Sequence, residues 1–228
     1  MCYANANREN RNLRKEAPAM EELKNIPMDP TAMFKLSYGL FVLSAREGEK
    51  DNGCIINTVT QVTTSPNRIT VAVNRANLTH DMIKNTGVFN VSVLSEEAPF
   101  ELFQHFGFQS GRTADKFDGW AYSRRSANGV LYLTACVNAY LSAKVVDMWE
   151  LETHTVFLAE VTEMAPLAAA PSMTYAYYHA EVKPKPQPVK KKGYVCNICG
   201  HIYEGETLPA DYVCPLCKHG PEDFSPLG

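Results

Sequence analysis

The sequence lacks the features that mark membrane, secreted and nucleic-acid-binding proteins. It contains no run of 18 or more apolar residues, so we expect no membrane span. The polar opening stretch, residues 1–30, has no apolar core of a secretory signal, which predicts a cytoplasmic protein. A net charge of −3 argues against nucleic-acid binding, because neutralising phosphates requires clustered Lys and Arg. Small molecules or other proteins are the expected partners.

A dinucleotide-binding GxGxxG motif and internal repeats are also absent, and short strand-like runs dominate the larger part of the sequence. Helical periodicity is confined to residues 79–85 and 99–106, with a further candidate at 20–25. Apolar runs separated by turn residues span 36–45, 54–59, 68–74, 88–94, 130–133, 136–148 and 153–164. Many short strands with few helices predict a mainly β fold, an antiparallel barrel, rather than a doubly wound sheet.

A Pro- and Lys-rich segment, KPKPQPVKKKG at residues 183–193, divides the chain. Its prolines favour an extended conformation of roughly 3.1 Å per residue, so it is expected to act as a linker of up to about 30 Å. The charge changes across it, since residues 1–182 carry 16 basic and 20 acidic side chains, whereas 194–228 carry one Lys and five acids. We therefore expect an N-terminal extension over 1–30, a larger domain over 31–182 and a small domain over 194–228.

Four of the seven cysteines lie in the small domain as two CxxC pairs, Cys196 with Cys199 and Cys214 with Cys217. In a cytosolic chain such pairs indicate metal ligands rather than disulfides. Four thiolates form a tetrahedral site that suits either zinc or a single iron. The spacing therefore predicts a metal without deciding between the two.

The residues around these cysteines resemble rubredoxin. The shared features are Tyr194 before the first pair, Gly200 after it, Tyr203-Glu204-Gly205, Pro209, Asp211, the Cys-Pro-Leu-Cys pair and Phe224. The resemblance implies one iron on the four cysteines, with the aromatic residues forming a small core around it. The gap at residues 200–213 is shorter than in free-standing rubredoxins and is similar to the rubredoxin-like domain of rubrerythrins. A zinc ribbon stays open as the alternative.

Residues 31–165 resemble the flavin reductase-like family of FMN-binding split barrels. The likeness rests on Tyr38-Gly39 opening the first strand, Asn57-Thr58-Val59-Thr60 ending the second, Thr64-Ser65-Pro66, Val73-Asn74 and Thr79-His80. It implies FMN contacts from Asn57, Thr58, Val59, Thr60, Thr64, Ser65, Asn74, Thr79 and His80. Hydroxyl and amide groups at strand ends and turns suit a phosphate and the polar edge of a flavin. Thr79 is equally suited to capping a helix.

A second block, Phe106 to Phe117, also matches the family's pattern. Within it Arg112 and Lys116 supply cations for a phosphate, and Gly111 allows the backbone to approach closely. Further on, His154 lies in a motif that resembles the family's flavin edge and is the candidate catalytic residue on the nicotinamide side, with a structural role as the alternative. An aromatic cluster that suits packing or covering the flavin follows at Tyr175, Tyr177, Tyr178 and His179.

The order of the two domains resembles the high-molecular-weight rubredoxins of anaerobic bacteria. The resemblance implies an oxidoreductase that passes electrons from NADH or NADPH to FMN, then to an Fe(Cys)4 centre, and then to a flavodiiron protein that reduces nitric oxide or dioxygen. It also implies a homodimer. Two other functions stay open: a flavin reductase that supplies reduced FMN to an oxygenase, and an FMN-binding protein with a structural zinc ribbon.

Overall fold

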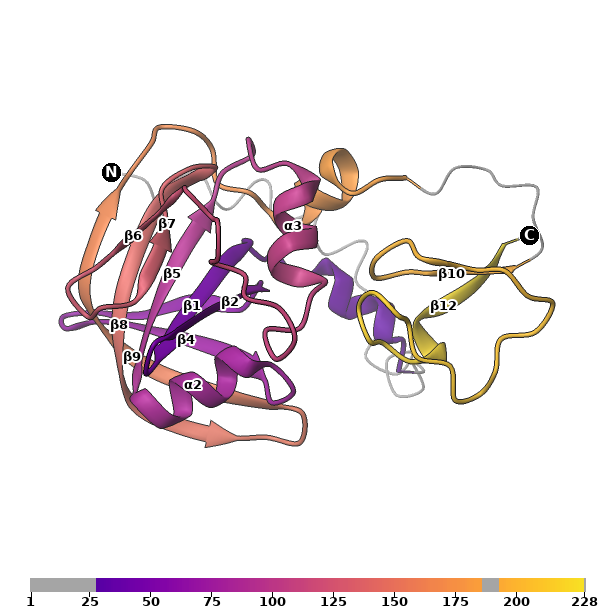
Figure 1. Cartoon of the computed structure of the whole chain (residues 1–228), viewed down its shortest axis with the longest axis horizontal. Coiled ribbons are helices and arrows are strands. Elements are labelled where there is room, and N and C mark those ends of the chain that lie inside the picture. The colour runs from indigo at the N-terminus through magenta and orange to yellow at the C-terminus, as the bar shows by residue number, and fades with distance from the viewer. Residues whose placement is uncertain (1–27, 186–192, 228) are drawn as a thin grey trace, which may run out of the picture. The chain divides into compact units, whose positions relative to one another are not determined.

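The computed structural model describes residues 28–185 and 193–227 (Figure 1). The predicted helix at 20–25, most of the expected N-terminal extension and most of the expected linker lie outside the described residues. Residues 28–36 belong to an N-terminal unit of their own, in which the short 3-10 helix η2 spans Pro30–Lys35. Asp29 caps η2, because its carboxylate accepts a hydrogen bond from the Thr31 N–H at 2.9 Å.

The larger domain is built on one seven-stranded sheet in which all neighbouring strands are antiparallel, in the order β2-β1-β5-β8-β9-β4-β3. Its strands are β1 Phe41–Glu47, β2 Lys50–Ile56, β3 Val59–Thr64, β4 Asn67–Asn74, β5 Val88–Leu94, β8 Val137–Glu150 and β9 His154–Pro166. A small second sheet pairs β6 Ser123–Arg125 with β7 Leu131–Leu133. The prediction of a mainly β fold is confirmed.

The sheet curls into a barrel because its two edge strands are consecutive in sequence. Strands β2 and β3 stand at opposite edges of the seven-stranded sheet, yet only Asn57 and Thr58 separate them. The three Cα–Cα steps from Ile56 to Val59 reach at most about 11 Å. The edges of a flat sheet of this size would lie roughly 29 Å apart, at about 4.8 Å per strand. The two edges therefore meet at this corner, as a split barrel requires.

The strand bounds predicted from the sequence agree with the structure for β5, a regular apolar run, and differ from it elsewhere. β5 has the predicted bounds, whereas β3 is not predicted, because its residues after Val59 are polar or exposed on both faces of an edge strand. Two predicted strand ends are wrong. β1 begins at Phe41 rather than at Tyr38-Gly39, and β2 ends at Ile56 before Asn57.

Two helices match the predicted ones, and each anchors a buried cluster: α2 Leu78–Thr86 and α3 Phe100–Gly107. In the first cluster Met82 of α2 packs with Phe157 of β9. In the second cluster Phe106 of α3 packs with Leu133 of β7. The domain ends in two short helical segments, α4 Tyr175–Tyr177 and the π-helical η3 Tyr178–Val182.

The small domain is a three-stranded antiparallel sheet with an aromatic core. Its strands, in the order β11-β10-β12, are β10 Gly193–Cys196, β11 Ile202–Tyr203 and β12 Phe224–Leu227, and the 3-10 turn η4 spans Pro221–Asp223. The ring of Tyr212 lies 4.7 Å from that of Tyr203 and 5.3 Å from that of Phe224. These rings pack with the cysteines, so the predicted aromatic core is confirmed. None of the helices described in either domain is long and apolar enough to cross a membrane.

Lys116 ties the segment after α3 to the barrel from inside. Only 3% of its surface is exposed, and its ammonium group donates to the carbonyl oxygens of Gly53 and Phe106, each at 2.9 Å. Burial lowers the pKa of this side chain. The sequence predicts that Lys116 binds a phosphate, but the structure directs its ammonium group into the protein. Its role in the described structure is to join β2, α3 and the segment that follows.

Replacing Lys116 should therefore destabilise the larger domain. Lys116→Met keeps the length of the side chain but leaves two buried carbonyl groups without a donor, so we expect the free energy of unfolding to fall by about 2 kcal/mol. Urea unfolding followed by circular dichroism measures the change. The matched control is Lys144→Met, at an exposed position of β8. An equal loss in both variants would contradict a structural role for the buried ammonium group.

Candidate functional site

The four cysteines of the CxxC pairs converge on one point. Their sulfur atoms all lie within 4.8 Å of one another, and the Sγ–Sγ distance is 3.5 Å both for Cys196 with Cys217 and for Cys199 with Cys214. A metal with bonds of about 2.3 Å to four tetrahedral thiolates separates the sulfurs by about 3.8 Å. The residues therefore fit a single iron or zinc. Within the described residues, no other group of His, Cys, Asp or Glu is arranged to hold a metal.

Both cysteine loops have the same backbone conformation. The N–H of Cys196 donates to the carbonyl of His201 at 2.8 Å, and the N–H of Cys214 donates to the carbonyl of His219 at 2.9 Å. The residue after each pair has a positive φ, 79° at Gly200 and 64° at Lys218. Glycine adopts this conformation without cost, so Gly200 closes its turn as predicted, whereas Lys218 does so with a side chain.

Burial and hydrogen bonds shift the pKa values of three of the four thiols, and not all in the same direction. Burial raises the pKa of Cys199 to about 11, although the N–H of His201 partly offsets it, and burial likewise raises the pKa of Cys217. The pKa of Cys214 is lowered, because the N–H groups of Cys217 and Leu216 and two neighbouring thiols outweigh burial. A bound cation must therefore displace protons from this group, and the N–H groups that face the sulfurs remain to stabilise the thiolates.

In the larger domain, the start of α2 lies against β2 and the segment after α3. Asn52 of β2 is buried and donates to the Thr79 hydroxyl at 2.8 Å. A Cβ atom added at Gly111 would lie 2.2 Å from the Asn52 Oδ1 atom, so residue 111 must be glycine for this approach. That Oδ1 atom has no hydrogen-bond partner among the described residues. The predicted residues Thr79 and Gly111 are thereby brought together.

His80 extends this group across the barrel. Its Nε2 lies 2.8 Å from the Thr155 hydroxyl of β9, and its Nδ1 lies 2.9 Å from Asp81. Arg112 donates to the other oxygen of Asp81 at 2.6 Å. The hydrogen bonds from His80 and then Arg112 lower the pKa of Asp81. His80 and Arg112, which are both predicted site residues, thus share one carboxylate.

The corner between β2 and β3 and the end of β4 complete the candidate flavin site. Thr58 is tied to β4, since its hydroxyl donates to the Ala72 carbonyl at 2.7 Å. Asn74 pairs in register with His154, so the candidate catalytic residue lies beside a predicted FMN contact. The Nδ1 atom of His154 is 2.8 Å from the Thr153 hydroxyl. Asn57 and Thr58 connect the two barrel edges, and Thr58 contacts β4 two residues before Asn74.

Other predicted contacts lie along the edge strand. Val59 pairs with Val71 at one end of the β3–β4 hairpin, whereas Thr64 pairs with Asn67 at the other. At about 3.4 Å per residue, the five steps from residue 59 to residue 64 span roughly 17 Å. The structure therefore does not bring Thr64 and Ser65 close to Asn74 and His154 of the same chain. Val59 and Thr60 lie at the end of the hairpin that is nearer to Asn74.

The first turn of α2 offers a site for an anion. Asn77 is the residue that precedes the helix, so capping by Thr79 is wrong: Thr79 is the second helical residue and is buried. The Asn77 side chain makes no capping hydrogen bond and interacts with the buried Cys54 thiol. Backbone N–H groups of a first turn without a side-chain cap attract a phosphate.

Sequence reasoning did not identify Asn52, Asn77 and Asp81 as part of this group. Asn77 carried a usable signal, because it stands directly before an apolar helical pattern and is a favoured capping residue. Asp81 follows His80 but gains its role from Arg112, 31 residues further on. Asn52 carried no signal in the sequence.

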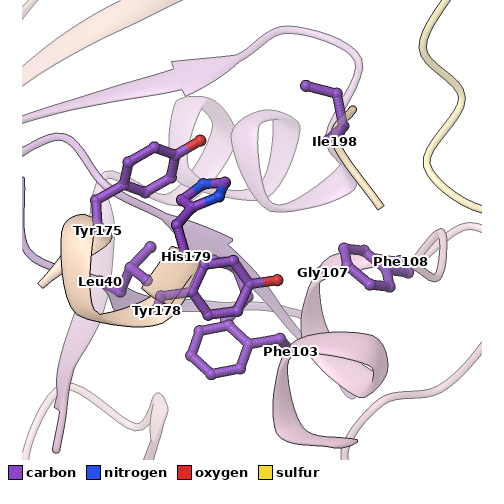
Figure 2. A pocket seen from close by; sticks show the side chains of 9 residues that line it. Leu40, Phe103, Gly107, Phe108, Tyr175, Tyr178, His179 and Ile198 are labelled. Atoms are coloured by element: carbon purple, nitrogen blue, oxygen red, sulfur yellow. The ribbon is translucent and has the colours of Figure 1, made fainter. Parts of the chain in front are cut away.

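An aromatic hollow lies beside the end of β2 in the larger domain (Figure 2). The residues of this domain that line it include Leu40, Ile55, Phe103, Phe108, Tyr175, Tyr178 and His179. The ring of Tyr178 packs 4.5 Å from that of Phe103, and the ring of Tyr175 lies 4.5 Å from that of His179. The predicted aromatic cluster therefore packs on α3 and leaves part of its surface open to the hollow.

Each of the two domains matches a known protein family. Residues 33–185 match the family described as flavin reductase like domain, and residues 194–225 match the rubrerythrin, rubredoxin-like domain. The chain is 37% identical to the high molecular weight rubredoxin of Moorella thermoacetica, over 88% of this chain and 100% of that protein. It is 39% identical to the ferric-chelate reductase (NAD(P)H) of Archaeoglobus fulgidus, over 69% of this chain and 93% of that protein.

Solved structures show the same barrel. An NADH:FAD oxidoreductase of Streptomyces globisporus superposes with a TM-score of 0.58 at 22% identity, over 66% of this chain and 92% of that one. This likeness establishes the fold of the larger domain. Together with the two family matches, it shows that the chain belongs to the flavin reductase-like family and carries a rubredoxin-like domain at its C-terminal side.

Proposed function

We propose that the chain is an NADH- or NADPH-dependent oxidoreductase that passes electrons through FMN and a single Fe(Cys)4 centre to an external redox protein. The observation that carries the proposal is a flavin reductase-like barrel joined to a four-cysteine centre in one chain. A four-thiolate site has no open position, so it transfers electrons and performs no substrate chemistry. FMN, when bound, accepts electron pairs from a nicotinamide and releases single electrons, which matches these two partners.

The residues that would hold FMN are those gathered around α2. The backbone N–H groups of the first turn suit the phosphate, and Asn57, Thr58 and Asn74 lie close by at the barrel corner with polar groups for the flavin edge. The orphaned Oδ1 atom of Asn52 can accept a hydrogen bond there. His154 beside Asn74 is our candidate on the nicotinamide side.

For the external acceptor we propose a flavodiiron protein that reduces nitric oxide or dioxygen. The support is the likeness to high-molecular-weight rubredoxins, which in the Moorella protein extends over both domains. The closed metal centre agrees with a protein acceptor, since a small substrate would find no free ligand position.

We also propose a cytoplasmic location, with which the reduced thiols of the two CxxC pairs agree.

The phosphate site on α2 can be tested with a variant that affects only the charge. Asn77→Asp places a carboxylate at the helix start, which favours the helix but repels a phosphate, so we expect FMN affinity to fall about tenfold and riboflavin affinity to stay unchanged. Fluorescence titration measures both constants. Asn67→Asp, at the far end of β4, is the control. Equal losses for FMN and riboflavin would place the phosphate elsewhere.

The relay itself predicts one iron and one FMN per chain, both bleached by NADH. Metal and flavin analysis with visible spectra before and after anaerobic addition of NADH checks this. Cys214→Ser should lose the iron bands and keep flavin reduction, because the flavin residues belong to the other domain, whereas Cys136→Ser should keep both. Zinc in the centre, or iron that stays oxidised beside reduced flavin, contradicts the relay.

A plain flavin reductase is the second candidate function. It is favoured by the Archaeoglobus relative, which matches 69% of this chain over 93% of its own length and is itself a reductase. In that case reduced FMN would leave the protein for an oxygenase. FMN that dilutes off readily, together with free FMN that turns over with NADH as a substrate, would support this function over the relay.

We further propose that the barrel forms a homodimer through the end of the β8–β9 hairpin. Val146, Met148, Trp149 and Leu151 are large apolar residues with 40–49% of their surface exposed, and exposed apolar groups that cluster in this way mark interaction surfaces. Light scattering should give about twice the chain mass of 25.4 kDa. Trp149→Arg should yield a monomer, whereas Tyr122→Arg, at an isolated exposed ring, should not. A monomeric parent protein refutes the dimer.

A further inference from the structure

The aromatic hollow of the larger domain is an apolar surface that the proposed flavin and nicotinamide sites do not use. Its wall combines the α3 residue Phe103 with Phe108, Tyr175 and Tyr178, and His179 stands exposed at its rim (Figure 2). The rings provide contact area for aliphatic side chains at little cost in side-chain entropy. The hollow therefore suits a small apolar protrusion better than a charged ligand.

The position of the hollow in the sequence restricts what reaches it. Tyr178 and His179 belong to η3, which ends at Val182 directly before the Pro-rich segment that leads to the rubredoxin-like domain. A tether of 11 residues confines that domain to within about 30 Å of its start. Its effective concentration near η3 is then in the millimolar range, so even a weak contact becomes populated.

The rubredoxin-like domain presents an aliphatic side chain on each metal loop. The loops read Cys-Asn-Ile-Cys and Cys-Pro-Leu-Cys, and their shared conformation puts Ile198 and Leu216 at equivalent positions, each directly before a cysteine. Leu216 is 45% exposed, and Val213 beside the same loop is 54% exposed. These two are the large exposed apolar residues in the described part of this domain. They mark the face nearest the metal as an apolar contact surface.

The charges of the two regions also favour contact between the rubredoxin-like domain and the aromatic hollow. Residues 194–228 carry five acids and one Lys, and four thiolates with an iron add one or two further negative charges. The segment that follows η3 begins with Lys183 and Lys185 and contains five lysines in all. Opposite charges at the rim steer encounter and leave the apolar centre to provide the contact.

We propose that the rubredoxin-like domain docks the face formed by Ile198, Val213 and Leu216 into the aromatic hollow of its own chain, as the electron-accepting position of the relay. This inference rests on the proposed function. With FMN and iron bound, this position would let one electron pass from reduced flavin to ferric iron. Two such transfers, each followed by reoxidation of the iron by the external acceptor, would use the electron pair from one nicotinamide.

Anaerobic stopped-flow spectroscopy of the full chain separates the two steps, since flavin and iron bleach at different wavelengths. With NADH, His179→Asp should reduce flavin at the parent rate but slow iron reduction at least tenfold, because a carboxylate at the rim repels the acidic domain. Leu216→Asp should do the same with an unchanged iron spectrum. Tyr122→Asp, at an exposed ring elsewhere in the larger domain, is the control. Combining His179→Asp with Leu216→Lys should restore the rate.

The outcomes distinguish this inference from the function on which it rests. Iron that NADH does not reduce in the parent protein overturns the proposed relay. Iron reduced at the parent rate in both single variants overturns the docking alone. Three other results for His179→Asp would also overturn the docking. Slower flavin reduction would assign the hollow to the nicotinamide, and a halved molecular mass would assign it to a second copy of the chain. Slower electron transfer only to an added acceptor protein would assign it to that partner.

Discussion

The candidate flavin site depends on the contact of Asn52 with Thr79 and Gly111. The buried amide of Asn52 holds the start of α2 through a hydrogen bond of 2.8 Å, and it leaves no room for a side chain at position 111. Arg112 follows directly and reaches Asp81 on α2, so one buried side chain fixes both the helix and the segment after α3. Any group bound at the first turn of α2 relies on this arrangement.

The barrel adds a second constraint, which acts on the polar residues at its corner. Because β2 and β3 are consecutive and stand at opposite edges, Asn57 and Thr58 must lie where the edges meet. The end of β4 is held there too, since Thr58 bonds to the backbone of Ala72. The strand order therefore brings Asn57, Thr58 and the end of β4 close together. Thr64 and Ser65 lie at the other end of the β3–β4 hairpin, away from them.

How much the sequence predicts depends on how far apart the contacting residues lie. The metal centre follows from two short motifs whose loops form locally, and β5 follows from a regular apolar run. The flavin site joins residues 27, 31 and 75 positions apart, which no local pattern reveals. Lys116 illustrates the difference: a cation in a polar segment suggests a phosphate ligand, but its carbonyl partners, Gly53 and Phe106, come from elsewhere in the fold.

Because the metal centre of the small domain is closed, its electron-transfer rate should depend on the protein surface around it rather than on a binding pocket. With four protein thiolates the centre exchanges electrons only through contact with another redox group, so its rate depends on what covers the metal loops. Buried cysteines limit that contact to one side, because Cys217 is partly exposed whereas Cys196, Cys199 and Cys214 are buried. Leu216 stands next to Cys217 on this side. A donor and an external acceptor would therefore compete for the same face.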